Sequence, residues 1–171
     1  GVVDFFLGEG SGVPVAVGVF TQAAVGIGHL LAESLKDRLV IANDTKHLTV
    51  VREFIARLIQ QSALSKEDEN KIILAVDEAV TNVIEHGYDN QNEGSIEIDV
   101  VSAPASFKIT IRDTGKIFNP TSTPSLNVQD HVKMGRKKGL GIFLMRQIMD
   151  EVKYTFRDGV KNELTMVKFI K

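Results

Sequence analysis

Two neighbouring segments of the chain alternate apolar and polar residues with the period of two that marks a half-buried β-strand. In each segment the apolar side chains share one side: Ile96, Ile98 and Val100 in SIEIDVV, and Phe107, Ile109 and Ile111 in FKITIRD. Two later segments, VKYTFRD and NELTMVKFI, flank Asp158-Gly159, which is a hairpin turn signal. A sheet that is apolar on one side must bury that side under another layer of structure.

Segments with helical periodicity can provide that layer. After a short strand around residues 39–42, Asn43-Asp44-Thr45 offers caps for a helix. Its buried face is expected to hold Leu48, Val51, Ile55 and Leu58. Ser65, three residues before Asp68, is expected to start a second helix over about residues 66–86, and Gly87 to end it as a left-handed cap. The buried stripe of this helix is expected to hold Ile72, Val76, Ala79, Val80 and Val83.

A third helix is predicted over about residues 140–151, before the last two strands. The predicted fold class is therefore α+β. We expect a two-layer sandwich in which helices cover one face of a mixed, mostly antiparallel sheet.

Residues 1–38 form an N-terminal extension in this scheme, and residues 39–171 form the main domain. The segment 13–31 is apolar enough to be considered as a membrane span, but Pro14 and several polar residues argue against one. We expect a buried strand over residues 15–20 and a helix over residues 22–38. That helix would close an upstream sensor domain, such as a GAF domain, or would dimerise through Val25, Leu31 and Leu35.

Composition excludes several classes of function. The 20 basic and 22 acidic residues leave a formal net charge of −2, which argues against a generally basic surface for nucleic acid. The absence of cysteine excludes disulfides, thiolate catalysis and cysteine–zinc sites, and it agrees with a reducing cytoplasm. The sequence has no basic region followed by an apolar run, so it does not indicate a signal peptide. We therefore expect a cytoplasmic protein that directly binds neither nucleic acid nor a membrane.

The segment AVDEAVTNVIEHGY, residues 75–88, has a helical apolar rhythm and an unusual polar side. Glu78, Asn82 and Glu85 share one stripe without a cation, although exposed helix faces commonly pair opposite charges four residues apart. An amide oxygen together with phosphate oxygens and water is enough to bind Mg²⁺. A carboxylate one turn earlier could orient or deprotonate an attacking hydroxyl. On helix geometry alone, a solvated polar face is the simpler interpretation.

The stretch IRDTGKIFNP follows the second alternating strand. Asp113 at the strand end could accept a hydrogen bond from an exocyclic amine such as that of adenine, and Gly115 would allow close approach of the backbone. Asp-x-Gly is also common in ordinary turns. The same triplet occurs in aspartic proteases, but those enzymes need a second carboxylate in a β-rich framework, and this chain is rich in helix.

The stretch GRKKGLGIFLM opens the third helix. Gly139 and Gly141 would leave free N–H groups at the positive end of the helix, where phosphate binds well, and three basic residues precede them. Neither a P-loop nor the strand that a Rossmann turn requires is present. Close helix packing is the alternative reason for these glycines. The irregular residues 114–138 before them are long enough to form a lid or a binding loop.

In this order, the three stretches resemble the boxes of the Bergerat-fold (GHKL) ATP-binding domains, specifically the anti-sigma factor serine/threonine kinases of the RsbW and SpoIIAB type. LAVDEAVTNVIEHGY is similar to the N box, IRDTGKIFNP to the first glycine box and KKGLGIFLMRQIMDEV to the second. The resemblance covers about residues 39–171. DEAVTN followed by EHGY is specific to this branch. DTGKIF lacks the second glycine of the superfamily's D-x-G-x-G form, although the kinase branch commonly has this shape before FNP.

The resemblance implies a role for each matching residue. Glu78 would be the general base, and Asn82 would hold magnesium. Asp113 would bind the adenine amino group, and Gly115 would line the base. The phosphates of ATP would be held around the second glycine box, by Lys137, Gly139, Leu140 and Gly141. ATP and Mg²⁺ are therefore the implied cofactors.

The implied activity is that of a serine/threonine protein kinase. It would phosphorylate a STAS-domain anti-anti-sigma protein and regulate a sigma factor or a similar target by partner switching. We also expect a homodimer. Two alternatives stay open: a nucleotide-dependent binding module without phosphate transfer, and a histidine kinase catalytic domain. The second would need a phospho-acceptor helix, which the sequence does not indicate.

Overall fold

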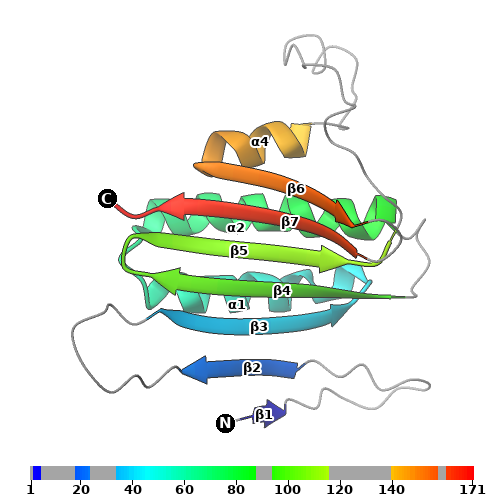
Figure 1. The fold of residues 1–171 in the computed structure, drawn as a ribbon, viewed down its shortest axis with the longest axis horizontal. Helices are drawn as coiled ribbons and strands as arrows, with labels where there is room; N and C mark the ends of the chain where they lie inside the picture. The colour runs from blue at the N-terminus through cyan, green and yellow to red at the C-terminus, as the bar shows by residue number, and fades with distance from the viewer. Residues whose placement is uncertain (1, 5–17, 24–33, 88–93, 116–139, 158–160) are drawn as a thin grey trace.

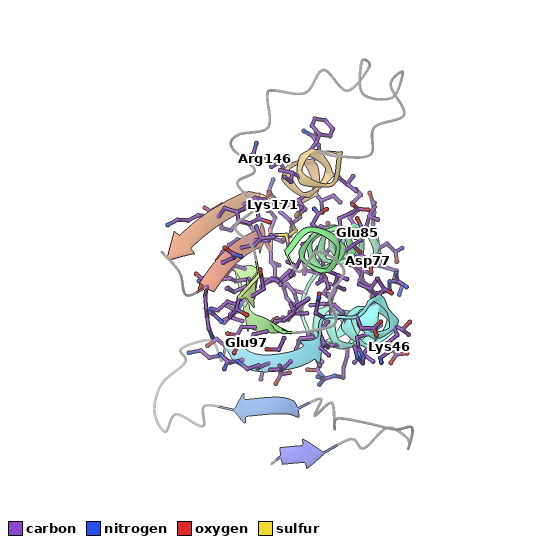
Figure 2. The ribbon with its side chains drawn as sticks, turned by 90° about the vertical axis from the view of Figure 1, so that its right-hand side faces the viewer. Lys46, Asp77, Glu85, Glu97, Arg146 and Lys171 are labelled. Atoms are coloured by element: carbon purple, nitrogen blue, oxygen red, sulfur yellow. The ribbon has the colours of Figure 1, made fainter. Side chains whose placement is uncertain are left out.

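The computed structural model describes residues 2–4, 18–23, 34–87, 94–115, 140–157 and 161–171 (Figure 1). Within these residues the chain forms one sheet with a layer of helices on one side of it, as the turned view in Figure 2 shows. The predicted two-layer α+β sandwich is confirmed.

Seven described strands form the sheet, and every neighbouring pair is antiparallel. Their spatial order is β1-β2-β3-β4-β5-β7-β6, so β7 lies between β5 and β6 (Figure 1). The bounds are Val2–Asp4 for β1, Gly18–Ala23 for β2, Leu35–Ala42 for β3, Ser95–Ala103 for β4, Ser106–Asp113 for β5, Glu151–Arg157 for β6 and Lys161–Phe169 for β7. A mixed sheet is expected from the sequence, but no parallel pair occurs among the strands that the structure describes.

The two alternating segments form β4 and β5, which pair with Ile98 opposite Ile111. The six apolar residues predicted to share one side are each at most 1% exposed, because the helices cover that side. β6 and β7 also pair, with Arg157 opposite Lys161. The predicted hairpin between them is therefore confirmed, while the turn at residues 158 and 159 lies outside the described residues.

The other face of the sheet carries a row of charges. Arg38, Asp99, Arg112 and Glu163 stand on β3, β4, β5 and β7. Asp99 bonds both arginines, and Arg112 Nε donates to Glu163 Oε2 at 2.7 Å. These partly exposed ion pairs suit an antiparallel sheet with one face in water.

Three described α-helices cover the apolar face (Figure 2). Their bounds are Leu48–Gln60 for α1, Lys66–Asn82 for α2 and Leu140–Ile148 for α4. A short 3₁₀ turn, η1 (Thr45–His47), precedes α1, and the carboxylate of Asp44 caps it by accepting from the Lys46 N–H at 2.9 Å. The Ser65 hydroxyl caps α2 by accepting from the Asp68 N–H at 3.1 Å. Both predicted caps are confirmed.

The predicted buried faces of α1 and α2 are confirmed too. Val51, Ile55 and Leu58 of α1 are at most 2% exposed, and Leu48 packs against the same core. On α2 the four residues Ile72, Val76, Ala79 and Val80 are at most 1% exposed, with Val83 partly buried beside them. Together with the sheet residues they form one hydrophobic core.

Two helix ends differ from the prediction. After Asn82 the chain continues as a π-helical turn, η2 (Val83–Gly87). The predicted left-handed cap at Gly87 is wrong, because Gly87 does not have the positive φ that such a cap needs. Among the described glycines only Gly94 has one, at 110°. α4 ends at Ile148, where Lys168 Nζ donates to its carbonyl at 3.0 Å, and residue 151 already belongs to β6. π-turns inside helices are often found at functional sites.

The helix predicted over residues 22–38 is wrong at both of its ends, and residues 24–33 between them lie outside the described residues. Gln22 and Ala23 belong to β2, and residues 35–38 belong to β3. β3 pairs along its whole length with β4, from Leu35 opposite Ser102 to Ala42 opposite Ser95. This long-range pairing satisfies the hydrogen-bonding edge of β4, and it outweighs the local helical spacing. A dimerisation helix through Leu35 is therefore wrong as well.

Several other expectations fall outside the described residues. They are the positions Val25 and Leu31 of the proposed dimerisation helix and nearly all of the proposed lid, from residue 116 on. The expected domain division at residues 38 and 39 falls inside β3. Of the helices that the structure describes, none combines the length and the apolar character needed to cross a bilayer.

Candidate active site

Glu78 and Asn82 lie one turn apart on α2 and face the first turn of α4. A Cβ placed on Gly141 of α4 would lie 2.7 Å from Oε2 of Glu78 and 3.4 Å from Nδ2 of Asn82. Gly141 itself is buried, whereas both α2 side chains are half-buried. The structure thus brings the carboxylate and the amide of the N box against a glycine of the second glycine box, about 60 residues later in the chain.

Asp113 ends β5, and its side chain is buried. Its Oδ1 accepts from the Gly115 N–H at 2.8 Å and from Nδ2 of Asn162 at 3.1 Å. The same Nδ2 donates to the carbonyl oxygen of Gly115 at 3.0 Å. Asn162 stands directly opposite Asp113 in the β5–β7 pairing. One amide group therefore holds both the carboxylate and the turn that follows it.

Gly115 lies against the end of the helix that carries Glu78. A Cβ at Gly115 would lie 2.5 Å from the carbonyl oxygen of Gly87 and 2.8 Å from its Cα. Real Cβ atoms do not approach backbone so closely, so this position needs glycine. In return, a Cβ at Gly87 would lie 3.6 Å from Oδ1 of Asp113. The π-turn after Asn82 thus connects the Glu78 group to the Asp113 group.

Burial dominates the electrostatics around Asp113. Loss of hydration raises the pKa of Asp113 above its usual value, although the hydrogen bonds from Asn162 and Gly115 oppose this shift. Burial also raises the pKa of Tyr154 to about 12, and the charge of Asp113 adds to that shift. A buried carboxylate held by neutral donors is well suited to accept a further hydrogen bond from a ligand, since such bonds are strengthened when water is excluded.

The remaining residues implied by the family resemblance lie wholly or partly outside the described part of the chain. Lys137 and Gly139 lie outside the described residues. Leu140 is the first residue of α4, and its side chain is likewise not described. The structure therefore places Glu78, Asn82 and Gly141 in one group and Asp113 and Gly115 in another.

Two acidic residues near the site, Asp77 and Glu85, do not belong to the Glu78 group (Figure 2). Asp77 makes a two-point ion pair with Arg52 of α1, with both N–O distances at 2.8 Å. Glu85 is exposed in the π-turn, so the regular α-helical spacing that would align it with Glu78 does not extend to it. Of the three residues in the predicted stripe, Glu78 and Asn82 are the pair that faces α4.

Sequence reasoning missed Asn162 and Tyr154. A signal for Asn162 was present, because this polar residue occupies a buried position in a strand where the following buried residues, Leu164 and Met166, are apolar. Its partner could not be known without the strand order, since β7 pairs with β5 as well as with its hairpin neighbour β6. Tyr154 carried no comparable signal.

The donors in the site suit the cofactors that the family resemblance implies. Mg²⁺ prefers hard oxygen ligands and keeps several waters, and the Asn82 amide and the Glu78 carboxylate, which both face Gly141, carry such oxygens. Among the described residues, no group of three or more acidic or histidine side chains could hold a metal without other ligands. A magnesium ion bound here would therefore take its other ligands from phosphate and water.

Comparisons with known proteins show the family to which the chain belongs. A model of the family described as "Histidine kinase-like ATPase domain" matches residues 41–168. The serine-protein kinase RsbW of Staphylococcus epidermidis is 30% identical over 131 residues, which cover 74% of this chain and 81% of that protein. RsbW of Staphylococcus aureus strain JH9 matches with the same identity and coverage. The chain is therefore a member of the histidine kinase-like ATPase domain family, distantly related to the RsbW serine-protein kinases of its anti-sigma factor branch.

Proposed function

We propose that this protein is an ATP-dependent serine/threonine protein kinase of the anti-sigma factor type. Its substrate would be a serine or threonine hydroxyl on a STAS-domain anti-anti-sigma protein. Phosphorylation of that domain would control, by partner switching, whether a sigma factor or a similar target is held. The observation that carries the proposal is the packing of Glu78 and Asn82 against Gly141, because it joins a carboxylate, an amide and a glycine-led helix in one half-buried place.

The chain's residues would divide the work of binding and chemistry. Asp113 accepts a hydrogen bond from the exocyclic amine of adenine, while Gly115 leaves room for the base beside it. Asn82 holds magnesium through its amide oxygen, and the ion neutralises charge on the phosphates when it is bound. The N–H groups at the start of α4, around Leu140 and Gly141, face the phosphates, with Gly139 and Lys137 preceding them.

Glu78 acts on the acceptor hydroxyl. It orients the hydroxyl and accepts its proton while the oxygen forms a bond to the γ-phosphorus. The bond between this phosphorus and the bridging oxygen breaks, and ADP leaves with the electron pair. The products are phosphoserine or phosphothreonine on the partner, ADP, and a proton carried by Glu78.

Substitutions at the two α2 residues separate chemistry from binding. Glu78→Gln should leave ATP affinity nearly intact and slow transfer by about 10²- to 10⁴-fold, because a general base acts mainly in the transition state. Asn82→Ala should weaken Mg·ATP and slow transfer together, since it removes a contact already made in the ground state. Single-turnover phosphorylation and an ATP titration with each variant measure both effects.

The chemical form of the product distinguishes the alternatives. Labelled ATP and candidate STAS proteins should give acid-stable phosphate on serine or threonine. Acid-labile phosphate would indicate a histidine kinase instead. ATP binding without any transfer would indicate a nucleotide-dependent binding module. Transfer by Glu78→Gln at the unsubstituted rate would contradict the general-base role.

The proposal extends to the setting of the protein. We infer that it acts in the cytoplasm as a homodimer, contacting proteins and neither nucleic acid nor membrane. We also infer that the kinase domain starts with β3 and that the residues before it form an N-terminal extension. Sedimentation of the full chain tests the oligomeric state.

A further inference from the structure

Gly141 occupies a position where the structure leaves no room for a larger residue next to Glu78. It is the second residue of α4, it is buried, and a Cβ there would lie 2.7 Å from Oε2 of Glu78. Ordinary Cβ contacts begin at 3.4 Å, so the two atoms would be about 0.7 Å too close. The nearest other atoms, Nδ2 of Asn82 and Cβ of Glu78, would lie at 3.4 and 3.5 Å, which is ordinary contact.

The atom that would be displaced is the far end of a flexible side chain. This differs from Gly115, where a Cβ would meet backbone atoms of Gly87. A side chain at position 141 therefore need not disrupt the fold, because Glu78 can rotate away from it. The carboxylate would then leave the place that it occupies beside Asn82.

Helix propensity does not explain this glycine. Alanine is favoured over glycine within helices because glycine loses more backbone freedom on folding. Gly141 is also not among the described glycines with a positive φ. Of the three atoms nearest to a Cβ at position 141, Oε2 of Glu78 is the one that the Cβ would displace.

We propose that Gly141 is a positioning residue, which fixes the carboxylate of Glu78 by leaving the space that its Oε2 fills. This inference rests on the proposed function, in which Glu78 is the general base. It assigns to Gly141 a role in addition to backbone contact with phosphate. A displacement of this size is enough to slow a reaction strongly, since misplacing a reacting group by about 1 Å can cost 10²-fold in rate.

The test is Gly141→Ala in the full chain. We expect a folded protein whose ATP affinity changes by less than about threefold and whose single-turnover transfer slows by about 10- to 100-fold. Because Gly141 would act through Glu78, adding Gly141→Ala to Glu78→Gln should slow transfer by less than about twofold more. Gln147→Ala is the matched control, since it changes an exposed position of the same helix and should transfer at the unsubstituted rate.

Three results would overturn the inference. The first is transfer by Gly141→Ala at the unsubstituted rate. The second is a loss of ATP affinity as large as the loss of transfer, which would mean that position 141 acts on the nucleotide directly. The third is full addition of the two losses in the double variant.

Thermal unfolding tests the contact even if the chain transfers phosphate to no acceptor, in which case the proposed function itself fails. The change in Tm caused by Gly141→Ala should be about 1–3 °C more positive in a Glu78→Ala background than in the unsubstituted chain. The reason is that Glu78→Ala removes the atom that the new methyl group would displace. If Gly141→Ala changed Tm equally in both backgrounds, Gly141 and Glu78 would not constrain one another, and the inference would be wrong.

Discussion

The contact between Gly115 and Gly87 predicts that an alanine substitution destabilises the protein at Gly115 but not at Gly87. In Gly115→Ala the new Cβ would lie 2.5 Å from the carbonyl oxygen of Gly87 and 2.8 Å from two further backbone atoms. Backbone atoms cannot rotate away as a side-chain end can, so the end of β5 and the π-turn must separate. Overpacking of this kind typically costs about 1–3 kcal/mol.

Separation would also weaken the hydrogen bonds of Gly115. Its N–H donates to Asp113 Oδ1 at 2.8 Å, and its carbonyl accepts from Asn162 Nδ2 at 3.0 Å. Each such bond contributes about 0.5–1.5 kcal/mol net. We therefore expect Gly115→Ala to lower the free energy of unfolding by about 2–4 kcal/mol. For a chain of this size that corresponds to a fall in Tm of roughly 4–16 °C.

Gly87→Ala is the matched control from the other side of the contact. Its Cβ would meet Asp113 Oδ1 and Val83 Cγ1 at 3.6 Å and Gly115 Cα at 3.8 Å, all ordinary contacts. Gly87 lies at the end of a helical turn without a positive φ, so alanine should leave stability within about 0.5 kcal/mol or raise it by up to about 1 kcal/mol. Urea unfolding of both variants, with unchanged m-values, measures the difference. Equal effects of the two substitutions would refute the reasoning.

Three further predictions concern the buried carboxylate. Asp113→Asn should weaken ATP by about tenfold or more, because it removes a charge-assisted hydrogen bond worth about 1.5–3 kcal/mol, and equal affinities of the unsubstituted protein for ATP and GTP would contradict this role. Since burial raises the pKa of Asp113, its ionisation costs native stability. The unsubstituted protein should therefore lose unfolding free energy relative to Asp113→Asn as the pH rises from the ordinary aspartate range through this raised pKa. Asn162→Ala should cost about 1–3 kcal/mol of stability, because it removes the amide that donates both to Asp113 Oδ1 and to the Gly115 carbonyl, and should raise the pKa of Asp113 further. Carboxyl titration by NMR checks that direction, and an unchanged or lower pKa would count against it.

Much of the fold is a local property of the sequence. The period-two segments became β4 and β5 with their apolar residues buried, and the caps at Asp44 and Ser65 start the helical segments as expected. The candidate site residues could also be proposed locally, since the order of the N box and the two glycine boxes is a property of the chain. Periodicity and caps depend on neighbours within a few residues, and a sequence displays these directly.

The N-terminal region shows where local information fails. The residues around Leu35 have helical spacing and lie in an antiparallel strand, because β4 offers a hydrogen-bonding edge along the whole of β3. Short apolar segments are compatible with either structure, so the neighbour decides between them.

The arrangement of the site was also decided by tertiary structure. The position of β7 between β5 and β6 brings Asn162 opposite Asp113, and the packing of α4 on α2 places Gly141 against Glu78. The contact of Gly87 in the π-turn with Gly115 was likewise decided by tertiary structure. By itself the sequence predicted which side of the main helices and strands is apolar and which residues are candidates for the chemistry. The tertiary structure decided which of those residues touch, because contacts between distant segments depend on strand pairing and on the space that a missing side chain leaves.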